Sequence, residues 1–175
     1  IEAQHPEVKE FANWNQTMDD VQFMCGLLNE LSTFNNSNRL HHSVFSIERL
    51  IRNIAVSFAI SLDAEDSDIE FSSKIAHGMG DFTGDKMKLE EVVLNLLRNA
   101  KDAVGEEGSI TLCAERDSDQ IIIRCKDNGC GIPDDIMDTI FEPFATHKEG
   151  GTGLGLSLFK RIVEAHEGTI TAESS

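Results

Sequence analysis

The sequence predicts an α+β fold: a two-layer sandwich in which helices cover one face of a mixed, mostly antiparallel sheet, preceded by a long N-terminal helix. Three observations predict it. Apolar residues recur at helical spacing between Asp85 and Val104. Two β-rich stretches, Ser109–Ala114 and Gln120–Lys126, are joined by a short polar connection, which is typical of an antiparallel hairpin. Helices and strands also alternate too irregularly for a parallel βαβ sheet.

Composition limits the class of protein. Of 175 residues, 31 are acidic and 15 are basic, so the formal net charge is −16. Such a surface repels phosphate backbones, which argues against nucleic acid as a partner. The four cysteines show neither a CxxC pair nor a Cys/His metal spacing, so reduced thiols and a cytoplasmic location are expected. No apolar run approaches the roughly 20 residues needed to span a bilayer, so no membrane contact is expected within this chain, although a longer parent protein could be anchored.

The first segment, from about Pro6 to Phe34, is predicted to form one long helix. Its apolar residues follow alternating steps of four and three, which makes a narrow stripe of the coiled-coil kind: Trp14, Met18, Val21, Cys25, Leu28 and Leu31. Such a helix could pack on its own domain. The narrow stripe, with no apolar helix directly after it, favours a partner helix instead.

A polar cluster at residues 35–38 is predicted to end this helix, and a linker is expected through His42. Residues 1–42 are therefore expected to form one unit and residues 43–175 a second. The second unit opens with an amphipathic helix that has Ser46 as its N-cap. One face of that helix carries Ile47, Leu50, Ile51, Ile54 and Phe58. Alternation from Ile69 to Ile75 predicts a strand, and turns are expected over Gly78–Gly84.

The C-terminal part is predicted to contain a short helix, Asp134–Phe141, then a helix over Ser157–His166 and a final strand over Gly168–Glu173. The chain begins with Ile1 and ends in mid-pattern. It is therefore expected to be a piece of a longer protein, without the last strand of its sheet.

The predicted helix Asp85–Val104 has two distinct faces. At about 100° per residue, one face is apolar and comprises Leu89, Val92, Val93, Leu96, Leu97, Ala100, Ala103 and Val104. The second face is polar and comprises Glu91, Asn95, Arg98, Asn99 and Asp102. Asn disfavours helices because its side-chain amide competes for backbone hydrogen bonds. Two Asn residues on one stripe of a helix therefore suggest a functional role. A carboxamide oxygen can bind Mg²⁺ and its NH₂ can donate to phosphate. The alternative is that the pair is incidental surface.

A turn with the sequence Asp-Asn-Gly-Cys-Gly begins at Asp127, directly after a predicted strand. A carboxylate buried there could accept a hydrogen bond from an exocyclic amine such as adenine N6, which would offset its desolvation. Gly129 and Gly131 permit positive φ angles and a close approach of the backbone to a flat ring. The alternative is a simple turn, because Asp-Asn-Gly is common in turns.

A glycine-rich segment, Gly150–Ser157, leads directly into a predicted helix. Free N–H groups and the positive end of the helix dipole would face a phosphate there, although the loop lacks the Gly-Lys-Ser/Thr ending of a Walker A motif and could be merely flexible. Upstream, Phe141 and Phe144 flank a proline and could anchor one end of a mobile segment. The polar run that follows could swing over a ligand as a lid, with Lys148 as the candidate to touch a terminal phosphate.

In this order, the Asn helix, the Asp-Gly turn, the Phe-x-Pro-Phe segment and the Gly-rich loop resemble the N, G1, F and G2 boxes of histidine kinases in the GHKL ATPase superfamily. The resemblance covers roughly Val44–Ser175. It implies a two-layer α/β sandwich that holds ATP and Mg²⁺ between helices, under a lid. It also implies a sensor histidine kinase of a two-component system, and the short lid looks like that of the nitrogen-regulator type.

The resemblance carries roles onto individual positions. Asn99 resembles the Mg²⁺-binding Asn of the N box, and Asn95 resembles the first Asn of that box. Hydrolytic members such as gyrase and MutL-like proteins place a catalytic Glu at the position of Asn95, as a general base for water, so Asn favours a kinase. Asp127 resembles the Asp that reads adenine. Asn95 and Lys148 are the expected catalytic residues. The positions expected to hold the nucleotide are Asn95, Arg98, Asn99, Asp102, Asp127, Gly129, Gly131, Ile132, Phe144, Thr146, Lys148, Gly151, Thr152, Gly153, Leu154, Gly155 and Leu156.

The N-terminal helix resembles the second helix of the family's dimerisation and phosphotransfer hairpin, which implies a homodimer in the parent protein. The family's phospho-acceptor is a His followed by an acid, and this chain has no match: His5 precedes Pro6, and His41 and His42 lie in the linker. The acceptor is therefore expected upstream of Ile1.

The function implied is that of a module that positions Mg·ATP for phosphoryl transfer to that His, and then to an Asp in the receiver domain of a response regulator. The alternative is a nucleotide-dependent interaction module, or a pseudokinase without phosphotransfer. An ATPase of the gyrase, MutL or chaperone type is disfavoured by Asn95.

Overall fold

The computed structural model describes residues 13–36, 39–65, 67–145 and 152–174. The helices are α1 (Trp14–Asn36), α2 (Ile47–Ala64), α3 (Lys86–Val104), α4 (Asp134–Met137) and α5 (Gly155–Ala165). The strands are β1 (Ser43–Ser46), β2 (Asp68–Ile75), β3 (Asp81–Gly84), β4 (Glu107–Asp117) and β5 (Gln120–Asp127).

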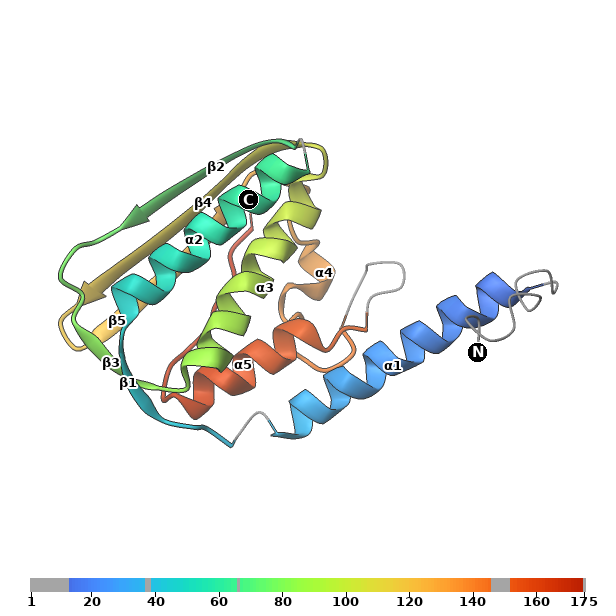
Figure 1. Ribbon diagram of the computed structural model, residues 1–175, viewed down its shortest axis with the longest axis horizontal. Coiled ribbons are helices and arrows are strands. Elements are labelled where there is room, and N and C mark those ends of the chain that lie inside the picture. Colours follow the sequence, from blue (N-terminus) through green and yellow to red (C-terminus); the bar gives the residue numbers. More distant parts are fainter. Residues whose placement is uncertain (1–12, 37–38, 66, 146–151, 175) are drawn as a thin grey trace, which may run out of the picture.

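The larger sheet has the order β2-β4-β5. β2 pairs with β4 in parallel, and β4 pairs with β5 as the predicted antiparallel hairpin. A second sheet consists of β1 and β3, which are antiparallel. Helices α2 and α3 lie on one face of the larger sheet (Figure 1). The predicted fold class, a two-layer arrangement with a mixed sheet, is therefore confirmed.

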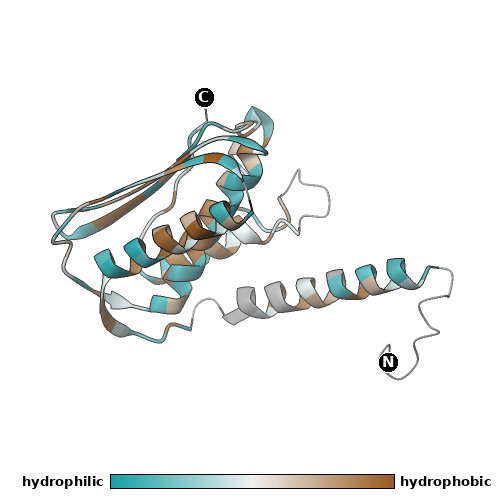
Figure 2. Ribbon diagram, turned by 45° about the horizontal axis from the view of Figure 1, so that its top comes forward, coloured by the Kyte–Doolittle hydropathy of each residue, from teal (hydrophilic) through white to brown (hydrophobic). Residues whose placement is uncertain are grey.

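The core fills the space between these two layers. The apolar face predicted for α2 is buried, and Ile51 is fully inaccessible. From α3, Leu97 reaches the same core, and from β4, Ile110 and Leu112 do so. Figure 2 shows that most hydrophobic residues gather in the helices and strands of the two layers. Each fully buried side chain of this size stabilises the fold by about 1.5–3 kcal/mol, so this core holds α3 firmly on the sheet.

A second, smaller cluster joins α5 to the side of α3. Val92 of α3 packs with Leu158, Phe159 and Ile162 of α5, and all four are buried. The cluster places the helix that follows the Gly-rich loop beside the helix that carries the Asn stripe. The cluster therefore fixes the position of α5, and with it the end of the Gly-rich loop, relative to α3.

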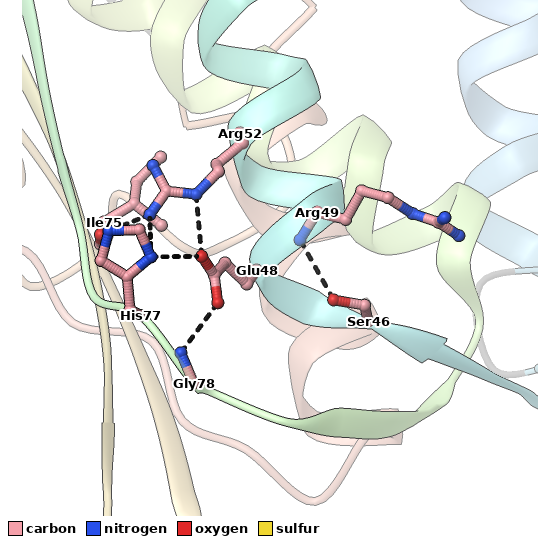
Figure 3. A network of polar contacts seen from close by, with 7 residues as sticks. All are labelled: Ser46, Glu48, Arg49, Arg52, Ile75, His77 and Gly78. Carbon is pink, nitrogen blue, oxygen red and sulfur yellow. Dashed lines mark hydrogen bonds and ion pairs between the residues drawn. The ribbon is translucent and has the colours of Figure 1, made fainter.

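The start of α2 holds the connection between β2 and β3 through a polar network (Figure 3). Glu48 accepts hydrogen bonds from Arg52 Nε, at 2.9 Å, and from the backbone N–H of Gly78, at 2.9 Å. Arg52 also donates to the carbonyl oxygen of Ile75 at 2.9 Å. The Arg52 hydrogen bond, followed by that of Gly78, lowers the pKa of Glu48 below its ordinary value. The predicted cap also forms, because Ser46 Oγ accepts the N–H of Arg49 at 3.3 Å.

Helix α1 reaches away from the two layers, although it contacts α5 (Figure 1). Parts of its predicted stripe face solvent: Val21 is 39% exposed and Leu28 is 66% exposed. Exposed apolar side chains of this kind are expected of a helix that packs against a partner helix. No helix within the described residues is long and apolar enough to cross a membrane.

Several predicted elements differ from the structure. The prediction that the unit from residue 43 opens with a helix missed β1, and the turn prediction missed β3. Each strand has only four residues and pairs with a segment about 40 positions away. The predicted helix Asp134–Phe141 ends at Met137 as α4, and turns follow it.

The ends of the chain differ as well. Residues 168–174 form no strand, so the predicted final strand is wrong. An alternating pattern becomes a strand only where a ladder partner exists, and Ser174 instead bonds through its side chain. Helix α5 begins at Gly155, two residues before the predicted start, and α1 extends to Asn36 through part of the predicted breaker.

Candidate functional site

The polar stripe predicted on α3 is present and turned away from the core. Asn95 and Asn99 are half-buried, while Arg98 and Asp102 are exposed. Arg98 Nη1 donates to Asn95 Oδ1 at 3.1 Å, so the guanidinium holds the carboxamide oxygen of Asn95. No such bond to Asn99 exists within the described residues, which leaves Asn99 as the better candidate for a metal ligand.

An open depression of about 260 Å³ lies beside this stripe. Its lining residues all come from α3 and are Met87, Glu90, Glu91, Leu94, Asn95 and Arg98. A drug-sized ligand usually occupies a pocket of about 300–1,000 Å³ with walls from several elements. The depression is therefore one side of a site at most.

The Asp-Asn-Gly turn docks on the C-terminal end of α3. The N–H of Cys130 donates to the carbonyl oxygen of Ala103 at 3.0 Å. A Cβ at Gly129 would lie 2.4 Å from the backbone of Ala103, so the turn approaches α3 as closely as only glycine allows. Asn128 Oδ1 accepts the N–H of Ser109 at 2.7 Å and fixes the turn to the start of β4. The turn and the Asn helix therefore form one rigid unit.

Asp127 is exposed, so the prediction of a buried carboxylate at this position is wrong. Its Oδ1 accepts the N–H of Gly129 at 3.0 Å, a short local loop that leaves the carboxylate at the end of β5 facing solvent. Of the two glycines, Gly131 has the positive φ that the sequence suggested, +73°, whereas Gly129 is required by packing against the protein itself.

Two neighbours complete this turn. The N–H of Ile132 donates to Ser174 Oγ at 2.8 Å, which ties the turn to the C-terminal segment. Behind the turn, burial and then the Asp127 carboxylate raise the pKa of the Cys125 thiol to about 12. Cys125 is therefore a structural thiol, while Cys130 on the turn is exposed.

Phe144 and Gly153 form a clasp that closes the segment between them. The N–H of Phe144 donates to the carbonyl oxygen of Gly153 at 2.9 Å. Both residues have positive φ, +70° and +67°, and a Cβ at Gly153 would lie 2.5 Å from the Phe144 carbonyl carbon. The Phe144 ring is 68% exposed, so its backbone rather than its ring holds the clasp. Thr146, Lys148 and Gly151, which the sequence assigned to the lid, lie outside the described residues.

The first turn of α5 suits an anion. The N–H of Leu154 donates to Thr152 Oγ1 at 3.3 Å, but among the described residues no side chain caps the helix. No acidic residue occupies its first turn. The N–H groups of Gly155 and Leu156 thus begin a helix whose own first turn carries no acidic side chain to neutralise its positive dipole end, which favours phosphate.

Three of the predicted parts converge on α3. Asn99 lies one helical turn, about 6 Å along the axis, from Ala103, where the Asp-Asn-Gly turn docks. Leu96, three residues before Asn99, packs against the α5 cluster. The turn thus contacts the C-terminal end of α3 and α5 contacts its middle, so both pack against the helix that carries the stripe. Asp102 lies in the last turn of α3, and Ile132 follows the Asp-Asn-Gly turn directly in sequence.

The donor chemistry of this region fits Mg²⁺ held jointly with phosphate. The described residues contain no cluster of three His, Cys, Asp or Glu that could hold a metal ion alone. Mg²⁺ usually keeps few protein ligands and takes the rest from water and phosphate oxygens, so one neutral oxygen from Asn99 is suitable. Sequence reasoning missed the role of Asn128 in fixing the turn, and its position within the motif was the available signal.

Comparison with known proteins identifies the same protein family that the sequence motifs resemble. The sequence model described as "Histidine kinase-, DNA gyrase B-, and HSP90-like ATPase" matches residues 84–175, slightly more than half of the chain. This chain is 40% identical to the signal transduction histidine-protein kinase AtoS of Escherichia coli over 107 residues, which is 61% of the chain. Over 93 residues, 52% of the chain, it is 44% identical to the C4-dicarboxylate transport sensor protein DctB of Rhizobium meliloti. The chain spans 18% and 15% of the lengths of these two relatives.

Solved structures share the fold. The catalytic domain of histidine kinase ThkA, in a nucleotide-free form, has a TM-score of 0.64 and 30% identity; the likeness covers 72% of this chain and 82% of that domain. A structure of histidine kinase ThkA in complex with response regulator protein TrrA has a TM-score of 0.70 at 24% identity. The likeness covers 89% of this chain and 44% of that one, and it shows the fold alone.

Proposed function

Because the chain belongs to the histidine kinase-, DNA gyrase B- and HSP90-like ATPase family, and its relatives are sensor histidine kinases, we propose that it binds Mg·ATP and positions the γ-phosphate for transfer to a histidine outside this chain. In the intact protein the phosphoryl group then passes to an Asp of a response regulator. The observation that supports the proposal is that the Asp-Asn-Gly turn and α5 both pack against α3, the helix that carries the Asn stripe.

The purine end of the nucleotide is assigned to the turn. Asp127 Oδ1 is engaged by Gly129, so Oδ2 is the oxygen that would accept the exocyclic amine of adenine. Gly131, Ile132 and Asp102 would line this end. Since Asn128 and Ala103 fix the turn on β4 and α3, the carboxylate is held in place before the nucleotide arrives.

The phosphate end is assigned to the middle of α3 and the start of α5. Asn99 would supply an oxygen to Mg²⁺, which when bound would neutralise charge on the phosphates. The N–H groups of Gly153, Gly155 and Leu156 would donate to phosphate oxygens, while that of Leu154 is held by Thr152. Arg98 lies on the same stripe as Asn99 and could also reach a phosphate. Thr146, Lys148, Gly151 and Thr152 join this assignment through the family resemblance.

Catalysis by these groups would be positioning and charge stabilisation, because phosphoryl transfer needs little covalent help from the protein. Asn95 cannot act as a base toward water, and its oxygen is already held by Arg98. This favours transfer to a histidine over hydrolysis. Lys148 would balance charge on the γ-phosphate.

The N-terminal helix is assigned to a homodimer of the parent protein, with the unit boundary near residue 42. The exposed apolar residues of α1 support this assignment, because a lone helix with such a stripe leaves apolar surface in water. The same exposure favours a second candidate function, a nucleotide-dependent interaction module that acts through α1 without phosphotransfer. Radiolabelled ATP and the full parent protein separate the two: label on a histidine upstream of Ile1 supports the kinase, and binding without label supports the module.

Calorimetric titration of the 175-residue chain with ATP and Mg²⁺ tests the first step. We expect Asp127→Asn to weaken binding about 10–100-fold, since a hydrogen bond to a charged group contributes about 1.5–3 kcal/mol. We expect Asn99→Ala to remove the gain in affinity that Mg²⁺ gives. Asp119→Asn and Asn53→Ala are matched controls, because both residues are exposed and lie elsewhere. Unchanged binding in Asp127→Asn, or an equal loss in the controls, would contradict the assignment.

A further inference from the structure

Three segments that are distant in sequence meet at Asp85, which is only 5% exposed. Its Oδ1 accepts the N–H of Lys88 at 3.2 Å and so caps α3. Its Oδ2 accepts the N–H of His41, in the linker after α1, at 2.9 Å. One buried carboxylate therefore joins the linker to the helix that carries the Asn stripe.

Lys88 gives the linker a second attachment to the same turn of α3. Its Nζ donates to the carbonyl oxygen of Arg39 at 2.6 Å. Burial alone would raise the pKa of Asp85, but the N–H groups of His41 and Lys88, together with the charge of Lys88, outweigh it and lower that pKa. The carboxylate is therefore ionised at neutral pH and makes charge-assisted hydrogen bonds, which are stronger than neutral ones.

His166, directly after α5, completes the junction. Its Nε2 accepts the N–H of Asp85 at 2.9 Å, so its proton lies on Nδ1, which donates to the carbonyl oxygen of Ile162 at 2.7 Å. The His166 ring also lies 6.3 Å, between centroids, from the ring of His42 in the linker. The end of α5 is thereby fixed to the beginning of α3 and to the linker.

Both helices lead from this junction to the proposed nucleotide site. Asn95 lies ten residues beyond Asp85, about 15 Å along α3, and α5 runs back from His166 to the Gly-rich loop. A shift of the linker that pulls on Asp85 would move the first turn of α3 and the last turn of α5 together. We infer that Asp85 couples docking of the linker to nucleotide binding, so that each stabilises the other.

This inference rests on the proposed function, since it requires that nucleotide binds to α3 and α5. Coupling of this kind is reciprocal: if the docked linker raises nucleotide affinity, nucleotide must hold the linker by the same factor. Typical couplings correspond to factors of about 5–150. Exchange of the linker amide hydrogens with deuterium therefore reports the same quantity as a nucleotide titration.

Asp85→Asn is the informative substitution. A carboxamide has one acceptor oxygen where the carboxylate has two, so the helix cap and the linker bond cannot both be kept, while Asn remains a good N-cap. Lys88→Met removes the bond to Arg39 but retains the apolar stem, and it serves if the first variant folds poorly. Ser46→Ala is the matched control, because Ser46 caps α2 by a similar bond to Arg49.

The experiment measures exchange at the His41 amide with and without Mg·ATP, and ATP affinity by calorimetry, in all four chains. We expect ATP to slow His41 exchange at least about fivefold in the unaltered chain, and the two junction variants to lose that response and to bind ATP at least about fivefold more weakly. The control should keep both. If the unaltered chain binds ATP and His41 exchange does not respond, the coupling is wrong and the proposed function stands. If it binds no ATP, both are wrong. An equal loss in Ser46→Ala would show an effect of stability and overturn the coupling.

Discussion

Substitution of Gly153 by Ala tests the clasp at the base of the Gly-rich loop. Two separate features of the structure make this position unsuited to a side chain. The φ angle is +67°, and a Cβ would lie 2.5 Å from the Phe144 carbonyl carbon and 2.6 Å from its Cα. Both contacts are with backbone atoms, which cannot turn aside as the end of a flexible side chain can.

The magnitude follows from these two terms. A non-glycine residue in the left-handed region costs about 1–2 kcal/mol. Inserting a methyl group into closely packed surroundings costs about 1–3 kcal/mol. We therefore expect Gly153→Ala to lower the free energy of unfolding by about 2–5 kcal/mol, a large fraction of the stability of a domain of this size.

Three other glycines separate the two terms. Gly78 has φ +71° with nothing within 4 Å of the position that a methyl group would take, so Gly78→Ala should show the cost of a positive φ alone. Gly129 has no positive φ, but its Cβ would meet Ala103 at 2.4 Å, so Gly129→Ala should show the cost of the contact alone. Gly26, within α1, has neither feature, and its replacement should not destabilise the chain.

Urea unfolding followed by circular dichroism at the helix band is the assay. Intrinsic fluorescence is unsuitable, because the chain has no Tyr and its one Trp, Trp14, lies in α1 rather than in the core. The reasoning is refuted if Gly153→Ala costs no more than Gly78→Ala, because the clasp would then tolerate the side chain that the geometry excludes.

Three further predictions concern titration, thiol reactivity and an ion pair. The pKa of Asp85 is lower in the folded chain than its ordinary value of 3.8, so ionised Asp85 stabilises the fold fully above that value, and this contribution is lost as pH falls through the folded-state pKa. The difference in the free energy of unfolding between the unaltered chain and Asp85→Asn should therefore shrink below about pH 4. Urea unfolding at a series of pH values measures it. Maleimide should label exposed Cys130 in minutes and Cys125 only on unfolding, because burial raises the pKa of the Cys125 thiol to about 12. If the proposed function is right, Mg·ATP should slow the labelling of Cys130. Peptide mass analysis measures both labelling rates. Lys101→Met should cost less than about 1 kcal/mol in thermal unfolding at physiological salt, because its ion pair with Glu65 is partly exposed; a larger loss would contradict the assignment of that pair as a surface contact.

Much of the fold could be predicted because its signals are local. The buried face of α3 is set by helical spacing within one segment, and the β4–β5 hairpin by two neighbouring stretches with a short connection. The strands β1 and β3 carry no comparable signal. Each becomes a strand only because Ser43 meets Gly84 across the fold, a pairing that no window of sequence contains.

The candidate site divides in the same way. The stripe of Asn95 and Asn99 follows from the period of one helix, so it could be predicted. The exposure of Asp127 could not, because it depends on how the turn docks on α3. The sequence pattern assigns Gly129 to a ligand, but the contact that requires a glycine there is with Ala103, about 26 residues earlier in the chain. The role of Asp85 in joining His41 to His166 likewise depends on contacts across the fold.

The β4–β5 hairpin offers a place for reporters. Its connecting turn lies at the opposite end of β5 from Asp127, and seven residue steps of about 3.4 Å separate the two by roughly 24 Å. Ser118 in that turn has φ +54° and is exposed. A fluorescent peptide inserted between Ser118 and Asp119 would therefore extend from the end of the hairpin, far from the carboxylate, and would not touch the surface proposed to bind nucleotide.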